Sequence, residues 1–375
     1  LDQPPPVQKN SYPLGLQGSA TATMRVLLLL AALAATTAIP TSPASKAPSQ
    51  DDELHLAFMS WKNKFEKVYE GAEHLARFAV FKANMEIIRA HNALFEIGEE
   101  TFSMAANQFA DLTAEEFKKT LMGYKPELKG KRLTQGFDSG NNCVHRKNNS
   151  SRPKSIDWRV KNAVTPVKNQ GQCGSCWSFS TTGAVEGAWV VAGHPLVSLS
   201  EEELVQCDTK SDEGCNGGLM DNAYAWIIQN GGIAAEDVYP YISGNGTTGV
   251  CHVAFLSKKV ASISDWCDLK PDDESDLELA LVQQPVAVAI EADQSSFQFY
   301  NGGVLPAKKC GTKLDHGVLA VGYGYDKKHK MHYWIVKNSW GAEWGEEGYI
   351  RLEKMPKKAK HSACGIAKAA SYPTV

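Results

Sequence analysis

The cysteines constrain what this chain can fold into more than any other feature. There are nine, and an odd count means that at least one thiol stays outside any set of disulfides. Disulfides form in the oxidising environment of the secretory pathway, and the start of the chain agrees with that destination. Met24-Arg25 precedes an apolar run and then small residues, a pattern that predicts a signal peptide over 24–38. Residues 1–23 lie before this methionine, and we set them aside as a leader of doubtful status.

Composition excludes several classes of protein. The chain has 39 Lys and Arg against 42 Asp and Glu, a formal charge of −3, whereas a nucleic-acid-binding domain carries a basic excess on one face. With 43% hydrophobic and 22% charged residues, it has the composition of a globular protein rather than a disordered or fibrous one. Beyond the signal segment, no apolar run approaches the length of a membrane-spanning helix. We therefore expect no nucleic-acid partner and no membrane anchor.

Two regions follow the signal segment, 39–151 and 152–375. The first begins with large apolar residues every three or four positions, which predicts two amphipathic helices packed as a hairpin. These positions are Leu54, Phe58, Trp61, Phe65, Leu75, Phe78, Phe81, Met85 and Ile88. Thr113 and Glu116 have the spacing of a capping box and predict the start of a third helix. Lys125–Arg152 has no periodicity and is predicted to be an exposed linker.

Cys173 and Cys176 have C-x-x-C spacing, for which there are three interpretations. A zinc site needs a second ligand pair at short spacing, and the sequence offers none. A thioredoxin-type redox pair would follow a strand in a βαβ unit, which the surrounding sequence does not suggest. The third interpretation places Cys176 in the first turn of a helix that continues over 181–192, where backbone N–H groups and the helix dipole favour a thiolate.

A catalytic thiolate needs a base, and the base needs a side chain that orients it. His316 opens the apolar run 318–321 and so lies at the start of a predicted strand. Asn338 follows a second predicted strand, Tyr333–Val336, and is close to Trp340 in the sequence. Each of these residues alone is more often structural than catalytic. Only the combination with the cysteine makes a nucleophilic site a hypothesis.

The residues around Cys176 resemble papain and the cathepsins. The family signature is followed far downstream by a histidine and an asparagine, and His316 and Asn338 lie 140 and 162 residues beyond Cys176. The first region is similar to a cathepsin L-type inhibitory prodomain, with matches at Glu73, Arg77, Phe81, Asn84, Ile88 and Asn92. A second prodomain motif covers Ala105–Asp111, with Ala105 where the family usually has glycine. The resemblance implies an α+β papain-like fold, with a helical half and a β-barrel-like half around a cleft, preceded by a helical inhibitory prodomain.

The resemblance also implies a role for each residue of the site. Cys176 would be the nucleophile, His316 its base and later the acid that protonates the leaving amine, and Asn338 the group that orients the imidazole. Trp340 would shield the bond between His316 and Asn338 from water. Gln170, six residues before Cys176, would form the oxyanion hole together with the Cys176 backbone N–H. No metal and no cofactor is expected.

Substrate-binding positions follow from the same resemblance. Gly217 and Gly218 would let an extended substrate backbone lie close to the wall of the cleft. The main specificity pocket would be lined by five apolar residues: Leu219, Met220, Ala289, Leu314 and Ala369. Because none of these side chains could pair with a guanidinium, the pocket is expected to prefer a bulky apolar residue over arginine.

The resemblance pairs six of the cysteines. The implied bridges are Cys173–Cys215, Cys207–Cys251 and Cys310–Cys364. Besides Cys176, this leaves Cys143 in the linker and Cys267, which departs from the family pattern. A buried free thiol is the first interpretation of Cys267, and an unusual bridge is the alternative. Sequons for N-glycosylation begin at Asn148, Asn149 and Asn245.

Together these features predict a secreted or lysosomal cysteine endopeptidase that is made as an autoinhibited zymogen. An inactive homologue would lack a catalytic residue, and a free-standing inhibitor would end near Arg152. No visible insertion blocks one end of the cleft, which favours an endopeptidase over an exopeptidase. The expected partners are protein and peptide substrates, the chain's own prodomain and cystatin-type inhibitors, and the expected state is a monomer. Acid is expected to loosen the prodomain through Asp111 and an ion pair between Glu73 and Arg77, which are four residues apart.

Overall fold

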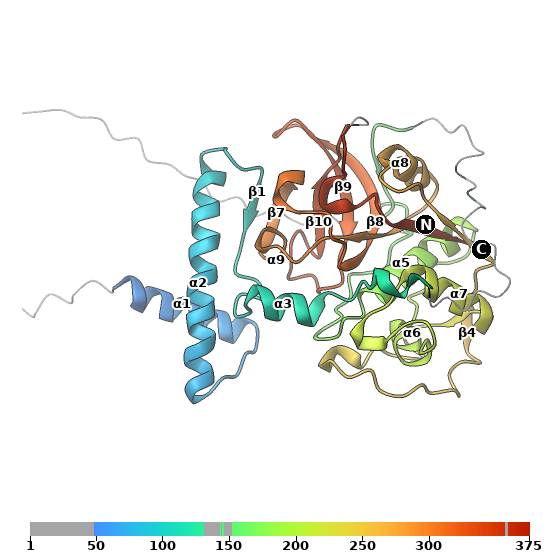
Figure 1. Ribbon diagram of the computed structural model, residues 1–375, viewed down its shortest axis with the longest axis horizontal. Helices are drawn as coiled ribbons and strands as arrows, with labels where there is room; N and C mark the ends of the chain where they lie inside the picture. Colours follow the sequence, from blue (N-terminus) through green and yellow to red (C-terminus); the bar gives the residue numbers. More distant parts are fainter. Residues whose placement is uncertain (1–48, 131–142, 144, 146–151, 357–358) are drawn as a thin grey trace, which may run out of the picture. The chain divides into compact units, whose positions relative to one another are not determined.

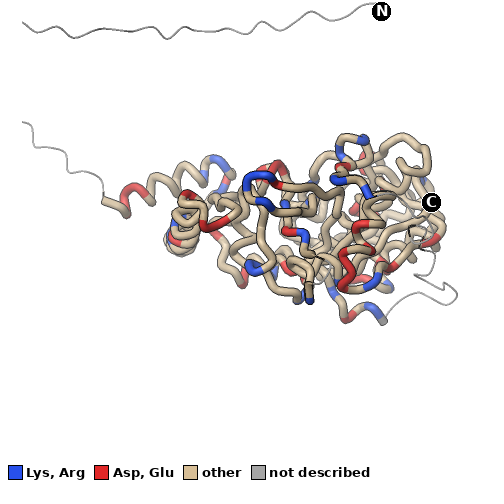
Figure 2. The backbone as a smooth tube through the Cα atoms, turned by 90° about the horizontal axis from the view of Figure 1, so that it is seen from above, with Lys and Arg blue, Asp and Glu red and all other residues tan. Residues whose placement is uncertain are grey.

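The computed structural model describes residues 49–130, 143, 145, 152–356 and 359–375. The predicted signal peptide, the leader before it and the two sequons that begin at Asn148 and Asn149 lie outside the described residues. Within the described part, no helix has the length and apolar character needed to cross a membrane. Figure 2 shows the Lys and Arg positions scattered among the Asp and Glu positions along the described backbone.

The N-terminal region begins with two helices that cross. Helix α1 spans Gln50–Lys64 and begins with a capping box, and α2 spans Gly71–Glu96. The rings of Phe58, Trp61 and Phe81 are buried at the crossing, with centroids 5.2–5.8 Å apart. Figure 1 shows the two helices crossing rather than lying side by side. The two amphipathic helices are therefore present, but the predicted hairpin is wrong because one aromatic cluster forms their contact.

A strand and a third helix connect this region to the rest of the chain. Strand β1 (Phe102–Met104) pairs antiparallel with β7 (Tyr300–Leu305), so the N-terminal region extends the sheet of the C-terminal region. Helix α3 spans Ala114–Leu121. It begins with the predicted capping box, in which Thr113 and Glu116 bond to each other's backbone N–H groups.

The predicted exposed linker, Lys125–Arg152, is only partly correct: Pro126, Glu127, Lys129 and Arg152 are exposed, but other described residues of the segment are buried. Its first part, Pro126–Gly130, forms the 3-10 helix η1, in which Leu128 is buried. Further along, Cys143 and His145 are 3% and 1% exposed. A segment without periodicity can still bury individual side chains against another part of the fold, and periodicity alone does not reveal this.

The helical half of the C-terminal region is built around α5 (Cys176–Val191). Residues 176–188 of this helix are buried, and a helix that is buried on every side belongs in the centre of a fold. It contacts α6 (Glu201–Cys207), α7 (Met220–Asn230) and three strands of the sheet. The shorter elements of this half are η2 (Gly214–Asn216), η3 (Ser243–Asn245) and the antiparallel pair β3 (Ile233–Ala234) and β4 (Lys259–Ala261).

The other half is a mixed sheet with the strand order β1-β7-β10-β9-β8-β6-β11-β5, and β2 pairs with β8. Its remaining strands are β2 (Ile156–Asp157), β5 (Asp265–Asp268), β6 (Val286–Ile290), β8 (His316–Asp326), β9 (Met331–Lys337), β10 (Tyr349–Glu353) and β11 (Ala370–Thr374). Paired neighbours are antiparallel except β10 and β7. Four short helices accompany it: α8 (Glu274–Gln283), α9 (Ser295–Gln298), η4 (Ala307–Lys309) and η5 (Ala363–Gly365). Figure 1 shows α5, α6 and α7 grouped beside this sheet, and the α+β papain-like fold is confirmed.

Four disulfides join described residues. Three are the bridges that the resemblance implies: Cys173–Cys215, Cys207–Cys251 and Cys310–Cys364. The fourth joins Cys143 to Cys267. The interpretation of Cys267 as a free thiol is therefore wrong, because the linker brings Cys143 against strand β5. Cys176 remains free and buried.

Candidate active site

Cys176 lies at the start of the central helix of the fold. Ser175 is the N-cap and Cys176 is the first residue of α5, so the thiol is next to a helix end whose N–H groups have no partner within the helix. Gly317 donates its backbone N–H to Cys176 Sγ at 3.3 Å. Because Gly317 follows His316 on β8, the packing of α5 against this strand brings the predicted nucleophile and base together.

His316 contacts two side chains that follow strand β9. Its Nε2 lies 2.8 Å from Asn338 Oδ1, so Asn338 accepts a hydrogen bond when Nε2 carries the proton. The indole of Trp340 stacks on the imidazole, with ring centroids 4.7 Å apart and an interplanar angle of 25°. Trp340 is fully buried. Its ring therefore keeps water from one face of the imidazole.

Burial decides the protonation of the thiol and the imidazole in this state of the chain. Burial raises the pKa of Cys176 to about 11, although the backbone N–H groups of Gly317 and Gly123 have a smaller effect in the opposite direction. Burial also lowers the pKa of His316 to about 4, against the bond to Asn338, which raises it. Both groups are therefore neutral near pH 7, because desolvation penalises their charged forms. The thiolate and imidazolium expected of an active site are disfavoured while the site is covered.

Gln170 is fully buried and held by three polar contacts. Its Nε2 donates to the carbonyls of Cys173 at 2.8 Å and Leu121 at 3.0 Å. Its Oε1 accepts a hydrogen bond from Ser339 Oγ at 2.7 Å. Leu121 is the last residue of α3 in the N-terminal region. The amide that would stabilise a negative oxygen is thus occupied by a carbonyl of the same chain.

The N-terminal region runs through the site directly after α3. The Gly123 carbonyl accepts the Gly218 N–H at 2.9 Å, and Lys125 donates its N–H to the Gly218 carbonyl at 3.2 Å. Between them, Tyr124 and Gly218 form a parallel β-bridge. We call residues 121–125 the occluding segment. It covers the surface on which an extended peptide would bind beside the thiol.

Comparison with known families accounts for both regions. Residues 152–374 match the papain family cysteine protease domain, and residues 58–117 match the cathepsin propeptide inhibitor domain (I29). The chain belongs to the papain family of cysteine proteases. Its N-terminal region is the propeptide, and the structure is that of a papain-family proenzyme.

Several relatives resemble this papain-family protease over most of its length. It is 44% identical over 330 residues to the KDEL-tailed cysteine endopeptidase CEP2 of Arabidopsis thaliana, covering 88% of each chain. It is 47% identical over 304 residues to cysteine protease 1 of Oryza sativa subsp. japonica, which covers 80% of this chain. This match spans 59% of the rice protein, less than two thirds of its length.

Solved proenzyme structures are similar to it as well. The digestive procathepsin L 3 of the Tenebrio molitor larval midgut is 40% identical, with a TM-score of 0.73 over 86% of this chain and 99% of that one. The proform of the ragweed pollen cysteine protease Amb a 11 is 36% identical, with a TM-score of 0.76 over 87% of this chain and 94% of that one.

The backbone of Gly123 in the occluding segment packs tightly against the backbone of the protease domain. A Cβ atom at this position would lie 1.7 Å from the Gly174 carbonyl oxygen, a backbone atom that cannot rotate away. We expect Gly123→Ala in the proenzyme to displace the segment and break its backbone bonds to Gly218. Each of these hydrogen bonds contributes roughly 0.5–1.5 kcal/mol to keeping the segment in place. Because both would be lost, reagents should reach Cys176 about 10–100-fold faster.

The measurement for Gly123→Ala is the rate at which an epoxide inhibitor labels Cys176 in the uncut proenzyme. Lys119→Ala, at an exposed position of α3, is the control and should leave the rate unchanged. Equal labelling rates for Gly123→Ala and the wild type would show that the contact between Gly123 and Gly174 does not close the site.

A cavity of about 280 Å³ lies beside the occluding segment, and Tyr124 contributes to its wall. Three predicted pocket residues line it: Leu219, Met220 and Ala369. The other two, Ala289 and Leu314, are not among its lining residues. Ala289 is fully buried in β6, and its N–H bonds to the Ala369 carbonyl at 2.9 Å. Leu314 lies against Gly365.

The cavity is less apolar than predicted. Asp221, Asp268 and Lys368 also line it. Burial raises the pKa of the Tyr124 hydroxyl, and the Asp221 and Asp268 carboxylates raise it further. The expectation of a pocket lined only by apolar side chains is therefore wrong for this cavity. Asp268 reaches this wall because β5 pairs with β11 just beyond Ala369, a tertiary contact without a local signal in the sequence.

The glycines expected along the cleft wall meet the occluding segment and the core. A Cβ on Gly217, which has a φ of +121°, would lie 2.6 Å from the Gly123 carbonyl oxygen. A Cβ on Gly218 would lie 2.6 Å from the indole of Trp177. Because neither position has room for a side chain, a peptide backbone can lie directly against this wall.

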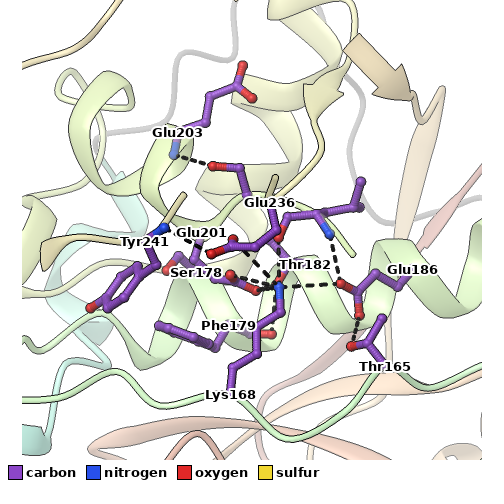
Figure 3. Close-up of polar contacts among 12 residues, drawn as sticks. Thr165, Lys168, Ser178, Phe179, Thr182, Glu186, Glu201, Glu203, Glu236 and Tyr241 are labelled. Carbon is purple, nitrogen blue, oxygen red and sulfur yellow. Dashed lines mark hydrogen bonds and ion pairs between the residues drawn. The ribbon is translucent and has the colours of Figure 1, made fainter. Parts of the chain in front are cut away.

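A network of charged residues, most of them buried, lies along helix α5 (Figure 3). The Nζ of Lys168 lies 2.8 Å from the Glu201 carboxylate and also donates to the Leu199 carbonyl at 2.8 Å. It lies 3.7 Å from the carboxylate of Glu186 and 3.8 Å from that of Glu236. Burial and, after it, repulsion from the Glu201 carboxylate raise the pKa of Glu236 to about 8. One lysine therefore lies against three carboxyls, and two of them, Glu186 and Glu201, have almost no access to water.

The network also reaches the strand that precedes Asn338. Thr165 donates its hydroxyl to Glu186 at 2.6 Å and accepts a hydrogen bond from Lys337 Nζ at 3.0 Å. Lys337 ends β9 and is followed by Asn338. A cavity of about 20 Å³, enough for one water molecule, is lined by Lys168 on one side and by Asn338 on another. The network thus connects α5, which begins at Cys176, to the end of β9, which is followed by Asn338.

Polar contacts within the propeptide differ from the predicted ion pair. Arg77 pairs with Glu116 at 2.9 Å, and it donates to the Asp111 carbonyl at 3.1 Å. The predicted pair of Arg77 with Glu73 is wrong, because the packing of α3 brings the Glu116 capping residue to the guanidinium. Asp111 is 1% exposed and accepts a hydrogen bond from the Tyr69 hydroxyl. The Asp111 side chain is therefore both buried and hydrogen-bonded.

Sequence reasoning missed several residues of the site and its surroundings. Ser339 holds Gln170, Asp268 lines the cavity and Cys143 bridges to Cys267. Only the bridge had a usable signal, since nine cysteines less the nucleophile leave an even number. Ser339 and Asp268 depend on which strands lie side by side, and this cannot be read from neighbouring residues.

Proposed function

We propose that the mature protease cleaves internal peptide bonds with Cys176 as nucleophile and His316 as base. Asn338 orients the imidazole, and Gln170 with the Cys176 backbone N–H stabilises the oxyanion. The observation that supports this is the path of the occluding segment. Its Leu121 carbonyl occupies the Gln170 amide, and its Gly123 bonds to the cleft wall. The propeptide thus blocks the groups that a substrate would need.

Removal of the propeptide restores the charged site. Once water reaches it, the desolvation that opposes charge is relieved, and the Cys176 proton moves to His316. The thiolate attacks the carbonyl carbon, and the tetrahedral intermediate collapses as His316 gives its proton to the leaving amine. A thioester remains. Water, deprotonated by His316, then releases the acid and regenerates the thiol.

An irreversible thiol inhibitor tests this site. A peptidyl epoxide should modify the processed enzyme at Cys176 alone and in equimolar amount, since this is the free cysteine among the described residues. The uncut proenzyme should react far more slowly because the occluding segment covers the thiol. Modification at another residue, or peptide hydrolysis that continues after complete modification, would contradict the assignment.

The proposed substrate preference is a bulky apolar or aromatic residue in the cavity beside the cleft. The propeptide itself contributes Tyr124 to this cavity, together with the apolar walls of Leu219 and Met220. The carboxylates of Asp221 and Asp268 are half-buried at the same cavity. They could attract a basic side chain, so the preference over arginine is expected to be limited rather than absolute.

Fluorogenic peptides that differ only in the residue before the one that donates the scissile carbonyl measure this preference. We expect kcat/KM for Phe or Leu to exceed that for Arg by about 10-fold, the scale of discrimination that pocket contacts provide. Asp268→Asn should increase the ratio of kcat/KM for Phe to kcat/KM for Arg, because it weakens Arg binding. Ala369→Glu should decrease the same ratio. Equal values for Phe and Arg in the wild type would refute the pocket assignment.

We propose further that the protease works in the secretory pathway, in a lysosome-like compartment or outside the cell. The predicted signal peptide supports this, as do four disulfides and the exposed sequon asparagine Asn245. A free catalytic cleft would also accept cystatin-type inhibitors, and a monomer is sufficient for the site because one chain supplies all its residues.

Acid should trigger processing through the carboxylates of the propeptide. Burial opposes ionisation of Glu116, but the Thr113 N–H and Arg77 outweigh it and lower the pKa of this carboxyl. The stability that it contributes is therefore present above its unfolded pKa of about 4.5 and is lost as the pH falls through the folded value. Burial lowers the pKa of His316 to about 4 and raises the pKa of Asp315 to about 7. Between these pH values the two groups change the stability in opposite directions and largely offset each other.

We expect Glu116→Gln to raise the processing rate near pH 5 by about 2–5-fold, the scale of a partly exposed ion pair. Asp111→Asn should have a larger effect in the same direction, because Asp111 is buried. The measurement is the rate of propeptide cleavage between pH 7 and 4. Glu115→Gln, at an exposed position next to Glu116, is the matched control. A profile unchanged by both variants would exclude these carboxylates as the trigger.

A further inference from the structure

Two cysteines that the reaction does not use join the propeptide to the protease domain. Cys143 precedes the protease match, which begins at residue 152, and it forms a disulfide with Cys267 in β5. The inhibitor match, 58–117, lies on the N-terminal side of Cys143. We propose that this bridge keeps the propeptide attached after the chain has been cut, so that release requires reduction as well as cleavage. The inference builds on the proposed protease function.

A second contact holds the same segment on the protease domain. The His145 ring is buried, with Nδ1 2.8 Å from the Tyr372 hydroxyl and Nε2 3.0 Å from the Asp276 carboxylate. Tyr372 belongs to β11 and Asp276 to α8. Cys143 and His145 therefore contact three elements of the protease domain. The segment is built into that domain and does not depend on the bridge alone.

A metal site is the competing interpretation of these residues. The ligand atoms of Cys143, His145 and Cys267 lie within 4.8 Å of one another, and two thiolates with an imidazole are a ligand set that suits zinc. In this structure the two sulfur atoms are bonded to each other, and both ring nitrogens of His145 have protein partners. The geometry favours the disulfide.

The position of the bridge decides what cleavage can achieve. A cut between Cys143 and Arg152 opens the backbone, but the chain from the inhibitor domain through Cys143 to Cys267 remains continuous. A tethered inhibitor has an effective concentration in the millimolar range for a short linker, so dilution does not remove it. The occluding segment can then return to the cleft each time it leaves. Cleavage alone would yield a nicked but still inhibited enzyme.

Reduction by a low-molecular-mass thiol completes the release. A thiolate of the reductant attacks the sulfur of one bridge cysteine, and the other bridge cysteine leaves as a thiolate. A second thiol of the reductant then attacks the mixed disulfide and frees the first cysteine. The bridge gains two electrons and two protons, and the reductant leaves as its own disulfide. Cys143 and Cys267 are 3% and 0% exposed, so attack should be slow until cleavage frees one end of the segment. The same reductant keeps Cys176 as a thiol, so the enzyme is released where its nucleophile is competent.

The test uses the full chain with Cys176→Ser and with residues 146–151 replaced by the recognition sequence of a site-specific protease. Cutting then does not depend on the chain's own activity. After cutting, free thiols are alkylated and the sample is run on a denaturing gel. We expect one species of full mass without reductant and two fragments with dithiothreitol. The double variant Cys143→Ser/Cys267→Ser should give two fragments in both lanes.

Two fragments from the bridged chain without reductant would overturn the proposal, as would one zinc ion bound per chain with both cysteines reduced. A second measurement uses the active chain after it has processed itself, in which dithiothreitol should raise epoxide labelling of Cys176 at least 10-fold. The double variant should label equally with and without reductant, and a similar response of both proteins would refute the tether. If the gel shows the tether but no peptide hydrolysis ever appears, the proposed function fails and the tether stands.

Discussion

Cys176→Ser is expected to reduce kcat/KM for peptide hydrolysis by at least about 10⁵-fold, because removing a catalytic nucleophile costs most of the rate enhancement. A serine hydroxyl at this position is a far weaker acid than a thiol, so the proposed base His316 would not generate the alkoxide as it would generate the thiolate. The residual rate would come from the oxyanion groups and substrate binding, which remain in place.

The same variant should fold normally, since Cys176 is outside all four disulfides of the described chain. Thermal unfolding and the tightness of the propeptide therefore serve as controls. The substitution also removes self-cleavage, so the proenzyme should accumulate uncut at acid pH. Turnover above about 1% of the wild-type value, or loss of the folded state, would contradict the role assigned to this thiol.

Lys168→Met is expected to lower the free energy of unfolding by about 3–5 kcal/mol, the typical cost of removing one partner from a buried ion pair. Lys168 lies 2.8 Å from Glu201 and 3.7 Å from Glu186, and these side chains are 1–2% exposed. Burial lowers the pKa of Lys168, but Glu201 and Glu186 outweigh burial and raise it, so the lysine stays charged. Without this cation the carboxylates must take up protons or admit water.

Chemical denaturation measures this effect, in a Cys176→Ser background that prevents self-cleavage. Lys258→Met, at an exposed position, is the matched control and should change stability by less than about 0.5 kcal/mol. Adding Glu201→Gln to Lys168→Met should recover part of the loss, because it removes one of the unpaired charges. A loss for Lys168→Met as small as that for Lys258→Met would show that the network carries little stability.

Local patterns account for most of the elements that the sequence predicted. The capping box of Thr113 and Glu116 starts α3, and the spacing of Phe58, Trp61 and Phe81 places their rings on the buried faces of α1 and α2. These signals involve residues within about one helical turn, and such neighbours determine caps and amphipathic faces. They do not determine how two helices meet, which is why the hairpin prediction failed.

The candidate site could be predicted because its chemistry restricts the residue types. A cysteine at a helix start, a histidine at a strand start and an asparagine after the next strand are recognisable in the sequence, and the structure brings Cys176, His316 and Asn338 together. The charge state was not predictable. It depends on burial under the occluding segment, which raises the pKa of the thiol and lowers that of the imidazole.

The sequence by itself determined the helices α1, α2, α3 and α5, the cysteine protease signature and the presence of a propeptide. Only the tertiary structure decided that Arg77 pairs with Glu116, that Asp268 lines the cavity and that Cys143 bridges to Cys267. In each case the partners are separated by tens of residues or more, or are brought to one site by strands that pair across the sheet. Contacts of this kind depend on packing and strand register, because the free energy of burial is shared among residues that are distant along the chain.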